Sequence, residues 1–387
     1  MKPAAVVIVG AGVMGASVAY HLTARGWRDV LVLDRSGGPG RGSTGAAAGG
    51  FRAQYATAIN VRLSLLAREK FVRFKDEIGS DPGYQPAGYL WLATTPAELD
   101  ILRAALRVQW DAGLYEAVEV NADDIARLSP AVAPGVALGG TFCPSDGYIA
   151  PLRILDGYLA AARRNGARLQ WGTNVTGFQV DGSGHIVSVE TDGGRIETAY
   201  VINAAGAWAA GLAQCAGVPV PVTPLRRQVA ATVPCTLLPP QTPMTIFAGD
   251  GFHFRVRDGR VLLLWPSPGV SGRPFDIRVD PEWLSAVARM AHQRVPALRT
   301  VDVDAAASWA GLYEMSPDKH AIIGPAPGCD NLYLINGSSG HGVMHAPALG
   351  ALLAELITDA RFSSLDATAL RPSRFAEGAP NPASGLL

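Results

Sequence analysis

An apolar segment, a glycine-rich turn and an acid at a fixed distance open the chain, and together they constrain its fold more than any other feature. Residues 6–9 read Val-Val-Ile-Val, and the turn that follows is Gly10-Ala11-Gly12-Val13-Met14-Gly15. Asp34 closes the next apolar segment, 19 residues after Gly15. A strand before the glycines, a helix after them and an acid at this spacing are the parts of a dinucleotide-binding βαβ unit. The opening of the chain therefore predicts a dinucleotide site.

Each part of this pattern has a physical reason. Gly10 allows the tight turn, Gly12 lets the backbone approach a pyrophosphate, and Gly15 lets the helix pack closely on the strand. The free N–H groups and the dipole at the helix N-terminus favour the bound anion. Asp34 can accept a hydrogen bond from a ribose hydroxyl. One such pattern provides for one dinucleotide, and the sequence holds no second one.

The composition indicates a folded enzyme of two domains. The chain has 387 residues, of which 17% are charged and 48% are apolar, and this balance argues against disorder. The net charge is zero and there is no basic run, so nucleic acid is not an expected partner. No apolar run reaches the roughly 18–20 residues of a membrane span, so none is expected.

The N-terminus and the cysteines lead us to expect a cytoplasmic protein. The first strand begins by residue 4 or 5, which leaves no room for a signal peptide. The cysteines lack the spacing of a metal site or a disulfide framework, and we interpret them as reduced core thiols. They are Cys143, Cys215, Cys235 and Cys329. No metal is expected.

Three further glycine-containing blocks follow the first one, and with it they carry a family resemblance. They are Gly42-Ser43-Thr44-Gly45, Asn203-Ala204-Ala205-Gly206-Ala207-Trp208 and Gly337-Ser338-Ser339-Gly340-His341-Gly342. In order and spacing the four blocks resemble the D-amino-acid oxidase superfamily of flavoenzymes. The similarity is to its glycine/sarcosine oxidase and dehydrogenase branch, which includes sarcosine oxidase β-type subunits and D-arginine dehydrogenase-like proteins. The resemblance implies FAD, bound in an extended conformation.

The resemblance also implies an α/β fold. It consists of a Rossmann-like FAD-binding domain and a discontinuous substrate domain, in which a mixed β-sheet and helices lie over the flavin ring. The order of helical and strand patterns predicts the boundaries. We assign residues 1–86, 147–218 and 306–370 to the FAD-binding domain, 87–146 and 219–305 to the substrate domain, and 371–387 to a partly disordered tail.

The cofactor residues follow from the motifs and the resemblance. Those expected to contact FAD are Gly10, Gly12, Val13, Met14, Gly15, Asp34, Arg35, Ser43, Thr44, Ala48, Gly49, Val175, Ala205, Gly206, Trp208, Gly311, Gly337, Gly340, His341, Gly342 and Val343. The Ser43 and Thr44 hydroxyls can bond the pyrophosphate or the flavin. The helix that begins near Val343 can direct its positive end at the flavin.

The flavin is expected to be held without a covalent bond. Some relatives attach FAD through a cysteine in the segment that here reads Ala310-Gly311-Leu312-Tyr313, where this chain has Gly311. Others use a histidine in the loop that here contains Ala46, Ala47 and Ala48. Both attachment positions lack a nucleophile.

An amino-acid substrate, which the resemblance implies, presents a carboxylate, and its site needs a cation to bind this group. Arg52 follows the flavin loop directly, and its guanidinium suits bidentate carboxylate binding; the alternative is a structural arginine that holds the loop. Strand alternation sends His253 and Arg255 to one face, either toward the substrate or toward solvent. The remaining expected pocket residues are Tyr55, Tyr313 and Met344. No residue is assigned as a catalytic base, because hydride loss from a neutral amine needs no strong base.

The predicted reaction is hydride transfer to flavin N5 from the C–N carbon of an amino acid or of an N-substituted or cyclic amine. Two alternatives stay open: an FAD-dependent 2-hydroxy-acid or polyol-phosphate dehydrogenase, and a non-catalytic flavin-bound subunit of a larger complex. The electron acceptor is oxygen or another molecule. Because no lysine lies between Lys75 and Lys319 to favour reaction with oxygen, the sequence favours a dehydrogenase. A partner subunit is possible.

Overall fold

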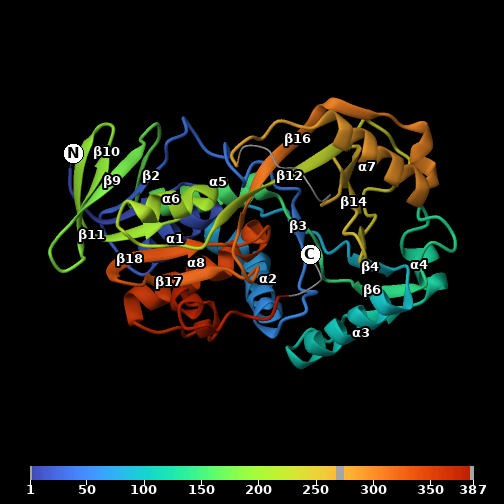
Figure 1. Cartoon of the computed structure of the whole chain (residues 1–387), viewed down its shortest axis with the longest axis horizontal. Helices are drawn as coiled ribbons and strands as arrows, with labels where there is room; N and C mark the ends of the chain where they lie inside the picture. Colours follow the sequence, from blue (N-terminus) through green and yellow to red (C-terminus); the bar gives the residue numbers. More distant parts are fainter. Residues whose placement is uncertain (1, 267–273, 384–387) are drawn as a thin grey trace.

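Two β-sheets with helices packed on them form the protein (Figure 1). The structure is a computed structural model that describes residues 2–266 and 274–383. Within these residues the first sheet has eight strands, ordered β17-β18-β11-β1-β2-β8, with β10 and β9 continuing from β11. Its bounds are β1 Ala4–Val9, β2 Val30–Leu33, β8 Arg168–Gln170, β9 Val175–Val180, β10 Ile186–Thr191, β11 Gly194–Asn203, β17 Ile322–Ala326 and β18 Cys329–Asn336.

Parallel pairing in the centre of this sheet sets the position of the glycine turn. β1 pairs in parallel with β2 on one side and β11 on the other, and β18 pairs in parallel with β11. β1 and β2 are mostly buried, apolar runs, as parallel strands covered on both faces are, and β11 is buried at its carboxyl end, from Val201 to Asn203. Their carboxyl ends therefore meet at one edge, where the loops after β1, β11 and β18 come together.

Helices α1 and α8 pack against each other on this sheet at close range. α1 (Val13–Ala24) is apolar on most sides because it lies between α5, α8 and the sheet. The Ser17 hydroxyl donates to the Ala346 carbonyl at 2.8 Å, and a Cβ at Gly350 would lie only 2.2 Å from Ser17 Oγ. The other helices here are α2 Ala58–Ile78, α5 Pro151–Arg164, α6 Ala209–Gln214, α8 Gly342–Asp359 and the 3₁₀ turn η1 Gly206–Trp208.

The second sheet is mixed and has eight strands among the described residues, in the order β16-β12-β15-β14-β13-β4-β6-β5. Only the β13–β4 pair of this path is parallel. Helix α7 packs near β15 and β16, and α3 packs on β4 and β6 (Figure 1). The bounds are β4 Tyr89–Ala93, α3 Pro96–Asp111, β5 Val118–Val120, α4 Ala122–Leu128, β6 Gly139–Cys143, β12 Thr223–Thr232, β13 Met244–Phe247, β14 His253–Arg257, β15 Arg260–Leu264, α7 Pro281–Arg294, η2 Pro296–Thr300 and β16 Val303–Met315.

The α/β fold with a second, mixed sheet is confirmed. β16 pairs with β12 as far as Met315, so the start of residues 306–370, which the sequence assigned to the FAD-binding domain, continues the second sheet. A short antiparallel pair, β3 (Gly50–Phe51) and β7 (Gly147–Tyr148), lies where the chain passes between the sheets. Among the described helices, none is long and apolar enough to cross a membrane.

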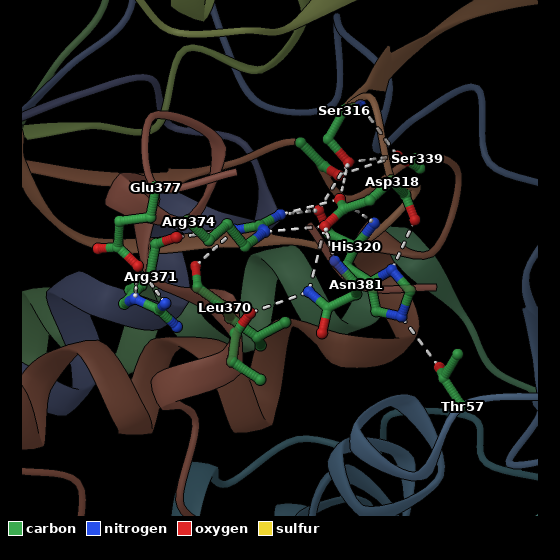
Figure 2. A network of polar contacts seen from close by, with 12 residues as sticks. Thr57, Ser316, Asp318, His320, Ser339, Leu370, Arg371, Arg374, Glu377 and Asn381 are labelled. Atoms are coloured by element: carbon green, nitrogen blue, oxygen red, sulfur yellow. Dashed lines mark hydrogen bonds and ion pairs between the residues drawn. The ribbon is translucent and has the colours of Figure 1, made fainter. Parts of the chain in front are cut away.

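The C-terminal segment, for which the sequence predicted a partly disordered tail, is folded in its described part. Residues 371–383 are folded onto the first domain and contain the short turn η4 (Pro372–Phe375), which follows the turn η3 (Thr368–Leu370). Figure 2 shows the fully buried Arg374 reaching Asp318, whose carboxylate it meets with Nε at 2.8 Å and Nη2 at 2.9 Å. Asn381 also donates to Asp318. The buried ion pair between Arg374 and Asp318 attaches this segment to the first domain, and nothing in the sequence indicated it. Residues 384–387 lie outside the described part of the chain.

Candidate active site

A cavity of about 870 Å³ extends from the glycine-rich edge of the first sheet to one face of the second. Its near end contains the turn after β1 and the start of α1, and its far end contains side chains of β12, β14 and β16. The cavity thus lies at the carboxyl ends of the parallel strands, where open α/β sheets bind ligands.

At the near end, Asp34 orders the loops around the start of α1. Its carboxylate accepts hydrogen bonds from the Ala11 N–H at 2.8 Å and from the Ser36 N–H at 2.8 Å. The Thr44 hydroxyl accepts from the Val13 N–H at 3.1 Å. Side chains from two later segments therefore fix the loop on which a dinucleotide would lie.

Two glycines of the turn after β1, Gly12 and Gly15, differ in what surrounds them. A Cβ at Gly15 would lie 1.9 Å from the Gly10 carbonyl oxygen, so this position permits the close packing of α1 on β1. A Cβ at Gly12 would meet one atom within 4 Å, Thr44 Oγ1 at 3.5 Å, so the space beside Gly12 is open to the cavity. Gly12 has no side-chain cap, which leaves N–H groups of the first turn available to an anion. This cradle fits the pyrophosphate of a dinucleotide.

Side chains of the second sheet hold the loop after Thr44 by donating hydrogen bonds to the carbonyl groups of the loop. Trp309 Nε1 donates to the Ala46 oxygen at 2.8 Å, and Arg257 Nη1 donates to the Ala47 oxygen at 3.2 Å. Arg255 Nη1 donates to the oxygens of Ala48 at 2.7 Å and Gly49 at 2.8 Å. Three side chains thus bind four successive carbonyls of the loop.

Arg255 is therefore not placed as the sequence led us to expect. It lies on the predicted face of β14, but it is 6% exposed, is absent from the cavity lining and stacks on the Tyr148 ring at 3.7 Å. Burial lowers the pKa of Arg255 to about 10. Strand alternation predicts the face on which a side chain lies but not how far it extends. Here the Arg255 guanidinium binds carbonyl groups of the loop and does not enter the cavity.

The third wall is the loop before α8. Ser339 and Gly340 have positive φ angles of 50° and 93°, and a Cβ at Gly340 would lie 2.4 Å from the Tyr313 ring. The first turn of α8 (Gly342, Val343, Met344) borders the cavity, so its positive end faces the ligand space. His341 is the N-cap of α8 and also lines the cavity.

Glu314 is a cavity residue that sequence reasoning missed. Its Oε1 accepts from the Ser338 N–H at 3.3 Å, while Oε2 is buried and has no hydrogen-bond partner among the described residues. Burial raises the pKa of Glu314 to about 7. A single glutamate in a strand gives no sequence signal for this environment.

Arg52 lines the cavity but is largely engaged within the protein. It is 4% exposed, and its Nη1 donates to the Gln54 oxygen at 2.8 Å. Its Nη2 lies 3.2 Å from His341 Nε2, and because a guanidinium only donates, His341 accepts at Nε2 and carries its proton on Nδ1. The guanidinium also stacks on the Tyr55 ring at 4.1 Å.

Tyr55 supports this arrangement from outside the cavity. Its hydroxyl donates to Met344 Sδ at 3.1 Å, and its ring meets that of His341 edge-on with centroids 5.0 Å apart. Burial raises the pKa of Tyr55, so the phenol stays protonated. Tyr55 therefore positions Arg52, His341 and Met344 and does not itself line the cavity.

The face of the second sheet completes the far end. Side chains of cross-strand pairs lie on the same face of a sheet, and His253 pairs with Leu264, which pairs with Val229. His253 therefore lies on the face of the second sheet that packs against Ala48. Phe252 and Phe254 instead enter the core beneath α7. Burial lowers the pKa of His253 to about 4, and Arg52 and Arg227 add to this effect, so the imidazole is neutral at pH 7.

Arg227 on β12 is the second missed residue. It pairs with Gly311 of β16, lines the cavity, and holds its guanidinium 5.9 Å from the centroid of the Tyr313 ring. Burial lowers its pKa, and Tyr313 alone acts in the opposite direction. The Arg226-Arg227 pair was visible in the sequence, but its facing partner on β16 was not.

Most predicted residues line one cavity. Of the predicted cofactor residues, those that do are Gly10, Gly12, Val13, Met14, Asp34, Arg35, Ser43, Thr44, Ala48, Gly49, Val175, Ala205, Gly206, Trp208, Gly311, Gly340, His341, Gly342 and Val343. Gly15 and Gly337 do not line it. Of the predicted substrate residues, Arg52, His253, Tyr313 and Met344 line it, whereas Tyr55 and Arg255 do not. No group of three potential metal ligands occurs in residues 2–266 and 274–383.

Similarity to known proteins extends over nearly the whole chain. The family profile described as FAD dependent oxidoreductase matches residues 5–356. The chain is 30% identical to FAD-dependent oxidoreductase domain-containing protein 1 of Xenopus laevis, over 96% of this chain and 82% of that protein. It is also 30% identical to the glycine oxidase of Geobacillus kaustophilus, over 91% and 92% of the two chains. The crystal structure of L-proline dehydrogenase from P. horikoshii matches with a TM-score of 0.89 at 27% identity, over 98% of this chain and 100% of that one.

Proposed function

The chain belongs to the DAO family of FAD-dependent oxidoreductases, and on that premise we propose that it oxidises the C–N bond of an amino acid or of an N-substituted or cyclic amine. The observation that carries this proposal is the cavity itself, in which the pyrophosphate cradle at Gly12 is continuous with a face bearing Arg227, His253 and Tyr313. The relatives named glycine oxidase and L-proline dehydrogenase support an amino-acid substrate.

The electrostatics of the far end favour a neutral amine. The burial and the two guanidinium groups that keep His253 unprotonated also disfavour a protonated amine beside it. A neutral amine has a free lone pair, which hydride loss from the adjacent carbon requires. FAD, when bound, supplies the hydride acceptor. The positive end of α8, at Gly342 and Val343, stabilises negative charge that develops on that side.

We propose that FAD is bound without a covalent link. Gly311 faces Ala46 so closely that a Cβ there would lie 2.7 Å from the Ala46 Cβ, which leaves no room for a cysteine side chain. Ser43 is also occupied, since its hydroxyl donates to the Leu312 oxygen at 2.7 Å. Acid precipitation is expected to release all flavin to the supernatant, and flavin that stays in the pellet contradicts this.

The electron acceptor is proposed to be a molecule other than oxygen, in keeping with the lack of a lysine on β15. One feature opposes this preference. Lys319, in the loop after β16, lines the cavity, and a cation near reduced flavin favours reaction with oxygen. Comparing the rate of reoxidation by air with that by a quinone decides between the two acceptors, and faster reoxidation by air contradicts the proposal.

Anaerobic reduction of the flavin tests the proposed function. A panel of amino acids, N-methylated amino acids, cyclic amino acids, simple amines and 2-hydroxy acids is added, and the oxidised flavin band is followed. Bleaching by one of the amine-containing classes is the expected result. Bleaching by 2-hydroxy acids or polyol phosphates alone contradicts it, and bleaching by no compound favours a flavin-bound subunit without turnover of its own.

A further inference from the structure

The arginines around the cavity differ in how their guanidinium groups are satisfied. Arg255 and Arg257 donate to loop carbonyls, and Arg52 donates to Gln54 and His341. Arg227 has no hydrogen bond or ion pair from its guanidinium to any residue that the structure describes, and its single recorded contact is the Tyr313 ring. Arg227 is half-buried, and a charge that has lost part of its hydration without gaining a partner is costly, so this cavity guanidinium marks a place for an anion.

The strand register directs Arg227 at the space where a substrate must lie. Arg227 shares its face of the second sheet with its pair partner Gly311, and Gly311 abuts Ala46 of the flavin loop. Tyr313 lies two residues further along β16 on the same face. The neighbouring Arg226 points to the other face, where its Nη1 donates to the Arg278 oxygen at 2.9 Å. The two adjacent arginines therefore have separate roles.

We propose that Arg227 binds the carboxylate of the substrate, which restricts the substrates to amines that carry an acidic group. This inference rests on the proposed function and replaces Arg52 as the anchor, because the Arg52 donors already hold Gln54 and His341. The planar guanidinium offers a pair of parallel donors that match a carboxylate. A bound carboxylate neutralises the charge of this half-buried guanidinium.

The other groups facing Arg227 agree with this role. Tyr313 is buried, and burial raises its pKa, so its hydroxyl stays protonated and available as a donor. His253 is neutral and lies within electrostatic reach of both Arg52 and Arg227. No Asp or Glu forms an ion pair with Arg227 among the described residues. An incoming carboxylate therefore meets donors and meets no competing acid at this guanidinium.

The test uses the FAD-loaded enzyme and a ligand that cannot be oxidised. Benzoate is titrated into wild type, Arg227→Gln and Arg226→Gln, and binding is followed by the change in the flavin absorbance spectrum. Benzamide, which has the same ring but no charge, is titrated in parallel. The Arg226→Gln variant is the matched control, because it removes the adjacent arginine from the opposite face of the same strand.

We expect Arg227→Gln to weaken benzoate binding by about tenfold to a hundredfold, the loss typical of a charge-assisted pair. Arg226→Gln is expected to bind benzoate as wild type does, and benzamide is expected to be insensitive to residue 227. Unchanged benzoate binding by Arg227→Gln overturns the proposal, as does an equal effect on benzamide or the absence of saturable benzoate binding by wild type. The benzoate titration measures binding and requires no turnover. Failure of this proposal can therefore be distinguished from failure of the proposed function, which the separate flavin reduction assay tests.

Discussion

A fully buried arginine and a half-buried one, in different regions of the molecule, show opposite ways of placing a charge inside a protein. Arg374, in the C-terminal segment, is 0% exposed and directs five hydrogen bonds from its guanidinium to Asp318, Leu370, Arg371 and His320 (Figure 2). Arg227, on the cavity face of the second sheet, has an aromatic ring nearby and no hydrogen bond from its guanidinium among the described residues. The first has the environment of a structural charge and the second that of a ligand-binding one.

The difference matters because the two environments predict different costs of removal. A guanidinium has five N–H donors, and Arg374 uses all of them within the fold. Removing it leaves the buried Asp318 carboxylate without its cationic partner and takes one hydrogen bond from each of three carbonyls, so stability should fall. Removing Arg227 breaks no hydrogen bond from its guanidinium to any residue that the structure describes, so stability should hold while ligand binding falls.

The largest expected effect is on Arg374. Arg374→Met should lower the free energy of unfolding by about 3–5 kcal/mol, because it strands the buried Asp318 carboxylate. Arg371→Met is the matched control, since Arg371 pairs with Glu377 at the surface and such pairs contribute about 0–1 kcal/mol. Urea unfolding of both variants measures this. Equal losses in the two variants would remove the distinction between the two environments.

Two carboxyl groups near these regions should show opposite pH dependence. Burial alone would raise the pKa of Asp318, but hydrogen bonds from Arg374 and Asn381 outweigh it, and the pKa is lowered. Its stabilisation is therefore present above the ordinary aspartate pKa and is lost as the pH falls below it. Burial raises the pKa of Glu314 to about 7. Its contribution is therefore present below the ordinary glutamate pKa and is lost as the pH rises toward 7, by on the order of 2–3 kcal/mol.

Unfolding of Asp318→Asn and Glu314→Gln between pH 3 and pH 8 checks these signs. The stability advantage of wild type over Asp318→Asn should shrink on acidification, whereas Glu314→Gln should gain on wild type as the pH rises from about 4.5 to 7. If the free energy of unfolding of either variant and of wild type changed with pH in parallel, the described environment of that carboxyl group would be contradicted.

Arg255 lies between the two extremes, because it satisfies protein groups at the edge of the cavity. Arg255→Met leaves the Ala48 carbonyl without this donor and removes one of two donors to the Gly49 carbonyl, and it should cost about 1–3 kcal/mol of stability. FAD affinity should fall with it, because the loop lines the cofactor cavity. Arg257→Met, which frees one carbonyl, should do less. Unfolding and FAD titration measure both, and a larger effect at Arg257 would contradict the assignment.

The smallest expected effect is on the stability of Arg227→Met. The free energy of unfolding should stay within about 0.5 kcal/mol of wild type or rise, because a half-buried charge is replaced by an apolar side chain of similar length. A loss comparable to that of Arg374→Met would mean that Arg227 has a structural partner and is not held for a ligand.

How far the sequence predicted these regions depends on the range of the interactions. The glycine turn, Asp34 and the loop before α8 were predicted because their signals are local and their chemistry belongs to backbone geometry. Arg374 and Asp318 are 56 residues apart, and no local pattern relates them. Arg227 needed the pairing of β12 with β16, which strand patterns do not specify.

Side-chain reach set the second limit. Alternation correctly sends Arg255 to the cavity side of β14, but the guanidinium extends to the loop carbonyls instead of the ligand space. Arg52 follows the flavin loop as expected, and its donors are then taken by Gln54 and His341. Long, flexible side chains make their final contacts only in the complete fold, so residue type and strand face are insufficient to assign them.

Anaerobic flavin reduction by L-proline or N-methylglycine, whichever bleaches the wild type, tests the central claim most directly. The observed rate is measured against substrate concentration for wild type, Arg227→Lys and Arg226→Lys. We predict that Arg227→Lys needs at least about tenfold more substrate for half-saturation, with the limiting rate within about threefold of wild type, because lysine keeps the charge but loses the paired donors. Arg226→Lys should match wild type. Unchanged half-saturation in Arg227→Lys, or no reduction of the wild-type flavin by any amino acid, would contradict the account.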